Sequence, residues 1–571
     1  MSRWYPERGY LQMTSTSQPT FNWTDFEPSY QALQQQDLTP GEVPSFLRAW
    51  SNLEKRVSEA YSTLQRARDR DTANEAAENA YLQFVREVRP KVQQAAQTLN
   101  RKLLSVENYE PDEQDELMFR KIRTDAELYR EENVQLDVRV TNLVNEYFKL
   151  TGGLTITLGD EELTFPQAQA NLLNPDRELR ERTWRLMQEA NARVAPELDR
   201  IFLDLLRLRR EAARNAGFGN YRDYRWQQLK RFHYTPEDSA ALHRAIATHV
   251  VPLVSRRREA QRVQMQLPSL RPWDLRADPL GRPAVVAFKD VRELEDAASR
   301  IFHKLAPKLG EQFDAMRDGG YLDLAARKNK APGAYCSSLP ARGMPFLHGN
   351  FVGTARDATV LFHEAGHAFH VFATANADIL MFARHSGAEF AEVASQSMEL
   401  LTLPYLAREQ GGLYDEADLP RVREEQLDSI VTFLPFAAVL DSFQHWVYTE
   451  TGEDVTIAEL DAKWLSLMRQ YFPHVDYTGL ESFVQKGWQY LHLYGYPLYY
   501  LDYAIAWLGA IQVWRGALAD QETALARYLD ALALGGTRSL PQLFEAAGAK
   551  LAFDEAHVGQ LMAFIEQQYS M

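Results

Sequence analysis

The stretch Thr359–His370, with the sequence TVLFHEAGHAFH, contains the pattern His-Glu-x-x-His. At about 100° per residue, His363 and His367 lie about 40° apart on one helix face and roughly one turn apart along the axis. Two imidazoles at this spacing can bind one zinc ion, while Glu364 stays free to act on a water molecule beside the metal. The stretch therefore predicts a zinc site on a buried helix. An ordinary buried helix with two hydrogen-bonded histidines is the alternative.

A zinc site of this kind needs a third protein ligand. His370 shares the face of the first histidine but lies about 10 Å further along the axis, so we expect it to pack beside the site or support it rather than bind the metal. The next predicted helix offers Glu389, Glu392 and Glu399 among apolar residues. Because Glu392 and Glu399 share a face within about 20°, they would be costly to bury without a cation. One carboxylate would bind the metal and the other would hold a ligand histidine.

The composition excludes several classes of protein. The chain has 571 residues, 45% of them hydrophobic, which predicts a folded protein of two or more domains or one large bilobed body. Its formal net charge of −15 argues against nucleic acid and anionic membranes as partners. The single cysteine, Cys336, excludes an internal disulfide and fits a reducing compartment. Residues 1–8 lack the apolar core of a signal peptide, and no apolar run suggests a membrane span, so we expect a soluble cytoplasmic protein.

Amphipathic periodicity predicts a mainly α-helical chain, beginning with long helices over residues 44–104. Residues 154–165 alternate at period two on either side of a Gly-Asp turn, which predicts a small β-hairpin. Residues 345–351 are a plausible strand just before the metal helix, as part of a short sheet. We place the domain boundary near residue 180, with an N-terminal helical lobe at 1–180 and a catalytic domain at 181–571.

The distal segment 490–503 holds six tyrosines and a histidine in fourteen residues. On composition alone, an aromatic packing face is the more ordinary interpretation. However, Gly495 and Pro497 mark a loop that enters a helix, and the phenols gather in the first turns of that helix. Hydroxyl groups held beside a metal-bound carbonyl would stabilise a developing oxyanion. Both interpretations stay open on the residues alone.

Two motifs together carry a resemblance. The sequence His-Glu-Ala-Gly-His is followed 25 residues later by Phe390-Ala-Glu392-Val-Ala-Ser395-Gln396 and then by Glu399. This arrangement resembles the oligoendopeptidase F and thimet oligopeptidase family of zinc metallopeptidases. In that family the glutamate of the Phe-x-Glu-x-x-Ser segment is the third zinc ligand, so the resemblance implies Glu392. The resemblance extends over roughly residues 180–565.

The same resemblance implies roles for the distal aromatic segment. Family members carry a histidine, a tyrosine and a helix with a Tyr-Tyr pair near the C-terminus. By position, the matching catalytic residues are His492, Tyr496, Tyr500 and Tyr503. Tyr499 competes for the Tyr500 role and is otherwise expected to contact substrate. We further expect the segment Phe346–Phe351 to be an edge strand that pairs with the substrate backbone, where the contacting residues are His348, Gly349 and Asn350.

The resemblance implies two helical lobes that enclose a deep channel for short, unfolded oligopeptides. It implies a zinc-dependent endopeptidase with one Zn²⁺ ion per chain, held by His363, His367 and Glu392, with Glu364 as general base. A zinc carboxypeptidase of related helical architecture is one alternative. The other is a non-catalytic helical peptide-binding protein with a vestigial metal site. The sequence leaves open whether the protein is a monomer or a homodimer.

Overall fold

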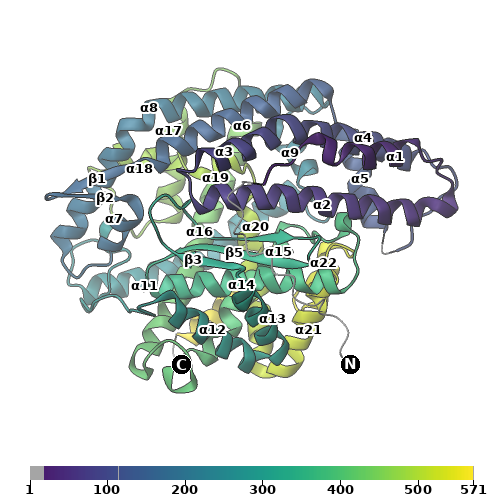
Figure 1. The fold of residues 1–571 in the computed structure, drawn as a ribbon. Helices are drawn as coiled ribbons and strands as arrows, with labels where there is room; N and C mark the ends of the chain where they lie inside the picture. The colour runs from purple at the N-terminus through teal and green to yellow at the C-terminus, as the bar shows by residue number, and fades with distance from the viewer. Residues whose placement is uncertain (1–18, 114, 570–571) are drawn as a thin grey trace.

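The structure is a computed structural model that describes residues 19–113 and 115–569. Residues 1–8, considered above for a signal peptide, lie outside these ranges. The fold is mainly helical, as predicted, and the first helices of the chain (purple) lie mainly in the upper right part of the molecule in Figure 1. Below them, a short sheet and the metal-site helices form the centre of the molecule.

The N-terminal helices have a hydrophobic core of their own. On α2, Phe46, Trp50, Leu53 and Val57 recur at three- and four-residue spacing and are all buried, which makes one apolar face. Neighbouring helices cover this face to form a core drawn from residues 26–122 and Ala383. The helices of this part are α1 (Glu27–Gln35), α2 (Val43–Arg70), α3 (Glu75–Gln83), α4 (Arg89–Leu104) and α5 (Glu116–Leu128).

The predicted hairpin is confirmed, with β1 (Thr155–Leu158) antiparallel to β2 (Glu161–Thr164). Gly159 has a φ of 67°, the left-handed conformation that a tight turn of this kind requires. The hairpin follows α6 (Glu131–Gly152) and precedes α7 (Phe165–Asn171) and the 39-residue α8 (Arg177–Asn215). The predicted boundary at residue 180 lies in the first turn of α8, and the division into domains stays a prediction.

A three-stranded sheet lies beside the metal helix, as predicted, in the order β3-β5-β4. The strands are β3 (Leu322–Ala325), β4 (Tyr335–Leu339) and β5 (Met344–Phe351). Because β5 pairs with β3 on one side and β4 on the other, its backbone is already occupied. The prediction that Phe346–Phe351 is an edge strand is therefore wrong. The edge strands are β3 and β4.

Helices precede and follow the sheet. Those before it are α9 (Tyr221–Gln228), α10 (Pro236–Ala245), α11 (Val251–Gln264), α12 (Val291–Leu305) and α13 (Pro307–Asp318). Those after it are α14 (Ala355–Asn376), α15 (Ala388–Leu401), α16 (Leu419–Thr449), α17 (Ile457–Tyr471), α18 (Glu481–Val484), α19 (Leu491–Gly495), α20 (Tyr500–Ala519), α21 (Gln521–Ala533), α22 (Leu540–Ala546) and α23 (Glu555–Gln568). They share one large core that runs from residue 128 to residue 565.

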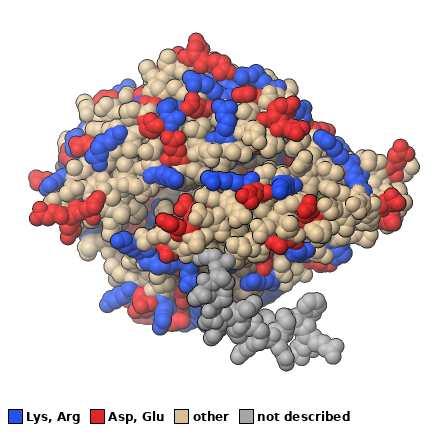
Figure 2. Space-filling view, turned by 45° about the horizontal axis from the view of Figure 1, so that its top comes forward, with Lys and Arg blue, Asp and Glu red and all other residues tan. Residues whose placement is uncertain are grey.

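Segment Glu416–Thr449, which contains α16, is long and apolar enough to cross a membrane by length and composition alone. Its most apolar window is 67% buried inside the fold, which is also what a core helix of a folded protein shows. On the surface, Lys and Arg side chains are intermixed with Asp and Glu over the face drawn in Figure 2.

Candidate metal centre

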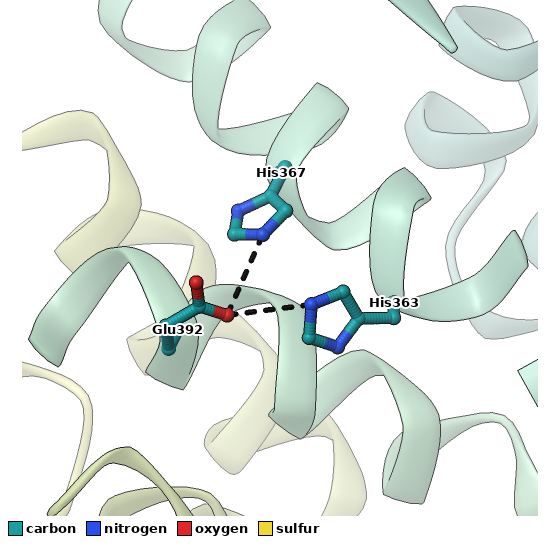
Figure 3. Close-up of side chains that lie close together, drawn as sticks. All are labelled: His363, His367 and Glu392. Atoms are coloured by element: carbon teal, nitrogen blue, oxygen red, sulfur yellow. Dashed lines mark ion pairs between the residues drawn. The ribbon is translucent and has the colours of Figure 1, made fainter. Parts of the chain in front are cut away.

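Three side chains converge between α14 and α15. Thr354 caps α14 by accepting from the backbone N–H of Asp357, and the helix then carries His363 and His367 one turn apart. Oε2 of Glu392, on α15, lies 3.3 Å from Nε2 of His363 and 3.5 Å from Nε2 of His367. Figure 3 shows both imidazoles directed at this one carboxylate oxygen. All three ligand atoms lie within 4.8 Å of one another, as a shared metal ion requires.

Glu399 orients the first of these histidines. Nδ1 of His363 donates to Oε1 of Glu399 over 2.7 Å, and Oε2 of Glu399 accepts from Nε2 of Gln426 over 2.7 Å. With its Nδ1–H engaged, the imidazole turns the lone pair of Nε2 toward Glu392. Glu399 thus lies where a carboxylate that supports a metal ligand is expected.

Gly366 allows the two helices to approach this closely. A Cβ atom on Gly366 would lie 2.6 Å from the carbonyl oxygen of Ala394 and 2.6 Å from Cα of Ser395. Real Cβ atoms do not approach backbone that closely, so a larger residue would push α15 away from α14. The glycine between the two histidines therefore sets the distance to Glu392.

Glu364 is buried beside the three ligand atoms, with 7% of its surface exposed. Burial raises the pKa of its carboxyl group, against the lowering effect of the charges on His363 and His367. The nearby backbone of Cys336 also lowers the pKa of this carboxyl group. Since Cys336 belongs to β4, the edge strand runs directly past Glu364.

His370 packs rather than supports the ligands. It is buried, and its ring meets the ring of Phe390 edge to face. Burial, with a contribution from the charge of His367, lowers the pKa of His370 to about 3, so the imidazole is neutral. Its Nε2 has no hydrogen-bond partner within residues 19–113 and 115–569. Of the two roles expected for His370, packing is the one that these contacts describe.

The distal tyrosines differ in where they point. The hydroxyl of Tyr499 donates to Oε1 of Glu392 over 3.3 Å, and the Tyr503 ring lies 5.3 Å from the Tyr499 ring. Burial and the Glu392 charge raise the pKa of both phenols. Tyr500 instead stacks on Phe433 and is 6% exposed. Tyr499 thus contacts the ligand cluster directly, and Tyr503 packs against Tyr499 beside it.

His492 and Tyr496 flank this pair of tyrosines. The His492 ring lies 4.6 Å from the Tyr500 ring, and burial lowers the pKa of His492 to about 4. Tyr496 is 48% exposed, and its ring lies 5.8 Å from that of His492. His492 is therefore neutral at neutral pH, and its buried Nδ1 has no hydrogen-bond partner in the described part of the chain. Tyr496 is exposed enough to contact a ligand.

On β5, two of the residues predicted to contact substrate instead form hydrogen bonds to the loop before β4. Nε2 of His348 lies 2.9 Å from the carbonyl oxygen of Ala331, and Nδ2 of Asn350 donates to Ala331 and Gly333. A Cβ atom on Gly349 would meet the ring of Phe351 at 2.9 Å. These three residues shape the segment that leads into β4, so their effect on a peptide at the edge strand is indirect.

Arg231, which no sequence motif marks, is a buried cation that joins α15 to α20. Its Nη2 donates to Oδ1 of Asp502 over 2.5 Å and to the carbonyl oxygen of Leu498. Tyr234 bridges Asp502 and Glu389, with 2.6 Å from its hydroxyl to Oε1 of Glu389. These partners lie more than 150 residues away in the sequence, so no local pattern could have identified the cluster.

A sequence profile described as Peptidase family M3 matches residues 171–562, more than half of the chain. The chain belongs to peptidase family M3. As an M3 member it is a metallopeptidase, and the cluster of His363, His367 and Glu392 has the geometry to hold a metal ion. No curated protein matches the chain in a sequence search.

Solved structures support the fold of this M3 peptidase. PZ peptidase A, solved with an inhibitor, is 26% identical with a TM-score of 0.90, over 98% of this chain and 99% of that chain. A protein assigned as oligoendopeptidase F is 28% identical with a TM-score of 0.90, over 97% and 98%. A second protein assigned as oligoendopeptidase F, from Bacillus anthracis strain Ames, is 23% identical with a TM-score of 0.86, over 97% of each chain. At this identity the similarity supports the fold alone. The expected resemblance to oligoendopeptidase F and the helical two-lobe architecture are thereby confirmed.

Proposed function

We propose that this M3 peptidase is a zinc-dependent endopeptidase that hydrolyses internal bonds of short, unfolded peptides. The observation that carries the proposal is the convergence of His363, His367 and Glu392 with Glu364 beside them. The cytoplasm, which we propose as the location because a single cysteine suits a reducing compartment, would supply such peptides as degradation intermediates.

The donor set fits one zinc ion. Two imidazole nitrogens and one carboxylate oxygen are a common set for a catalytic zinc, which keeps its fourth position open. Ligand atoms about 2.0–2.1 Å from a tetrahedral zinc lie about 3.4 Å from one another. The measured separations of 3.3 Å and 3.5 Å agree with this value.

Zinc bound there would polarise the substrate carbonyl and make a nearby water easier to deprotonate. Glu364 is suited to accept the proton from the attacking water, because burial raises the pKa of its carboxyl group. The same carboxyl group can then give the proton to the departing amine.

The aromatic segment can stabilise the oxyanion that forms on the substrate. Phenols of Tyr499 and Tyr503 stay protonated near neutral pH, since burial raises their pKa values, and can therefore donate hydrogen bonds. His492 and Tyr496 flank them and offer further donors. Tyr500, buried against Phe433, is better suited to fix the start of α20.

The substrate backbone would pair with β4. Its outer edge pairs with no other strand in the described part of the chain, and Cys336 on β4 already contacts Glu364. A peptide added at this edge would present its carbonyl groups to the ligand cluster in an extended form. This requirement for an extended backbone favours unfolded peptides over folded proteins.

A blocked peptide tests the proposal. A quenched fluorescent peptide with an acetylated N-terminus and an amidated C-terminus should be cleaved internally by enzyme that contains about one zinc per chain by elemental analysis. A carboxypeptidase would release single residues only from the free acid. Failure to cleave any blocked peptide with zinc bound would refute the endopeptidase assignment.

A further inference from the structure

The loop between α19 and α20 carries the exposed Tyr496 and leads directly into Tyr499. The last turn of a helix leaves backbone carbonyl groups without partners inside that helix. In α19 these include the carbonyl groups of Leu493 and Tyr494, and Pro497 interrupts the backbone further because it has no N–H. A surface loop of this kind is ordinarily mobile unless other groups bind its carbonyl oxygens.

Arg209, on α8, binds the end of α19. Its Nη1 donates to the carbonyl oxygen of Leu493 over 2.8 Å, and its Nη2 donates to that of Tyr494. Nη1 also donates to the hydroxyl of Tyr448 over 2.9 Å, and only 3% of the arginine is exposed. One buried guanidinium group therefore satisfies two carbonyl groups that the short helix α19 leaves open.

Two further arginines bind the other end of the loop. Nε of Arg225, on α9, donates to the carbonyl oxygen of Pro497 over 3.2 Å. Nη2 of Arg231, just after α9, donates to the carbonyl oxygen of Leu498 and to Oδ1 of Asp502, each over 2.5 Å. Because Asp502 lies in the first turn of α20, these contacts fix the loop where it enters that helix.

The backbone N–H groups of the loop also have partners. The N–H of Leu498, a residue with a φ of 62°, donates to Oε1 of Gln444 over 2.6 Å. The N–H of Tyr496 donates to the carbonyl oxygen of His492 over 3.1 Å, and that of Tyr499 donates to the carbonyl oxygen of Tyr496 over 3.2 Å. A left-handed leucine persists only where surrounding contacts outweigh its cost. Side chains of α8, α9 and α16 thus specify the conformation of this loop.

These contacts place the phenols before any substrate is present. Tyr496 is 48% exposed although its backbone is hydrogen-bonded on both sides, and its ring lies 6.4 Å from that of Tyr499. The hydroxyl of Tyr499 in turn donates to Glu392. A hydrogen-bond donor that is already in place need not be ordered during the reaction, and such donors stabilise a developing oxyanion best.

We propose that Arg209, Arg225 and Arg231 are positioning residues that hold loop 493–498 in one conformation. They act through Tyr499, whose hydroxyl they set beside the ligand cluster before a substrate binds. The catalytic consequence rests on the proposed endopeptidase function, whereas the order of the loop does not depend on it. Guanidinium groups suit this role, because each offers five N–H donors in a fixed planar arrangement.

Hydrogen exchange of the loop amides tests this positioning without any peptidase activity. The variant is Arg231→Lys, which keeps a positive charge beside Asp502 but replaces the rigid, planar donor group by a single flexible one. Mass spectrometry of segment 491–499 should show slow exchange in the full-length wild type without peptide. We expect exchange about tenfold faster in the variant, because the loop opens more often once its carbonyl contacts are weakened.

The matched control is Arg180→Lys, at the other end of α8. Arg180 is 2% exposed and donates to Asp274 and to the carbonyl oxygen of Trp273, so its burial and its partners resemble those of Arg231. This control should leave the exchange of segment 491–499 as in the wild type. A loss of loop protection in Arg180→Lys equal to that in Arg231→Lys would overturn the assignment of the effect to the loop contacts.

Arg225→Gln is a second variant in which folding is at little risk, because Arg225 is only partly buried and binds one loop carbonyl. We expect faster exchange of segment 491–499 here as well, and thermal midpoints check that all variants are folded. Rapid exchange of the segment in the wild type would overturn the proposal. So would wild-type exchange in both Arg231→Lys and Arg225→Gln.

A double-mutant cycle tests whether Arg231 acts through Tyr499. We expect Arg231→Lys to lower kcat about tenfold with little change in KM, because a displaced hydroxyl stabilises the oxyanion less. In the Tyr499→Phe background the same substitution should change kcat by less than about twofold, since the hydroxyl that it positions is gone. An equal decrease of kcat in both backgrounds would show a general structural effect and would exclude the positioning role.

The loop and the peptidase assignment can fail separately. If the wild type cleaves no blocked peptide, the endopeptidase assignment falls. Slow loop exchange that becomes faster in Arg231→Lys would still support the proposed order of the loop. If the wild type cleaves blocked peptides while its loop exchanges rapidly, the positioning proposal falls and the endopeptidase function stands.

Discussion

Nδ1 of His363 lies 2.7 Å from Oε1 of Glu399, so the imidazole is fixed by a carboxylate on the side opposite the ligand cluster. Such partners of metal-binding histidines set the orientation and the basicity of the ligand. The hydrogen bond joins the two helices that make the site, since His363 belongs to α14 and Glu399 to α15.

Glu399→Gln should therefore weaken zinc binding without removing a ligand. An amide in this place loses the charge that stabilises the imidazole, and we expect zinc affinity to fall by about 10- to 100-fold. Competition with a fluorescent chelator measures the change. Glu416→Gln, at an exposed glutamate outside the ligand cluster, is the control. Equal zinc affinity in Glu399→Gln and the wild type would show that this hydrogen bond does not support the metal.

Gly366→Ala should force α14 and α15 apart. The added Cβ would lie 2.6 Å from backbone atoms of Ala394 and Ser395, and overpacking of this kind typically costs about 1–3 kcal/mol. We expect lower thermal stability together with lower zinc affinity, because Glu392 moves with α15. Gly516→Ala is the matched control, since its Cβ would meet only Ala524 at an ordinary 3.6 Å. Full zinc affinity in Gly366→Ala would contradict the spacing role.

Removing single hydroxyls should rank the tyrosines. We expect Tyr499→Phe and Tyr503→Phe to lower kcat by about 10- to 100-fold with little change in KM, as for the loss of an oxyanion donor. Tyr500→Phe, at a residue turned toward Phe433, should change kcat less. Steady-state kinetics on one blocked peptide supply the comparison. The ranking is wrong if Tyr500→Phe has the largest effect on kcat.

The metal helix and its third ligand segment could be predicted because their signals are local. The spacing of His363 and His367 is a property of one helix, and the hairpin at 155–164 is a property of two adjacent strands. The sheet order was not predictable in this way, since the partner that occupies β5 is β3, more than twenty residues upstream. Nothing in the segment 345–351 itself reveals that both of its edges are paired.

The tyrosine that contacts Glu392 also depends on a non-local feature. Leu498 has a φ of 62°, a left-handed conformation that is uncommon for leucine. It is held there by Gln444, whose Oε1 accepts from the Leu498 N–H over 2.6 Å, and by Arg231, which donates to its carbonyl oxygen. This bend sets how α20 begins and turns Tyr499 toward Glu392. Position in the motif alone favoured Tyr500.

Acid should destabilise the protein through His474, whose Nδ1 lies 3.2 Å from the Ser255 hydroxyl. Burial, together with the charge of Arg258, lowers the pKa of His474 from 6.5 to about 4 in the folded state. In the unfolded chain His474 binds a proton near pH 6.5, whereas in the folded chain it binds one only near pH 4. The free energy of unfolding therefore decreases as the pH falls from 6.5 toward 4. At pH 5 the loss is about 2 kcal/mol. Urea unfolding of His474→Gln should show a smaller decrease between pH 7 and pH 5, and an equal decrease would exclude His474 as the cause.

The most direct test of the account is the Glu364→Gln variant, assayed for zinc and for hydrolysis in the same preparation. Glu364 is proposed to move protons without binding the metal, so the variant should keep about one zinc per chain. Its hydrolysis of a blocked peptide should fall by about 100- to 10,000-fold. Hydrolysis at the wild-type rate by the zinc-loaded Glu364→Gln variant would contradict the proposed function.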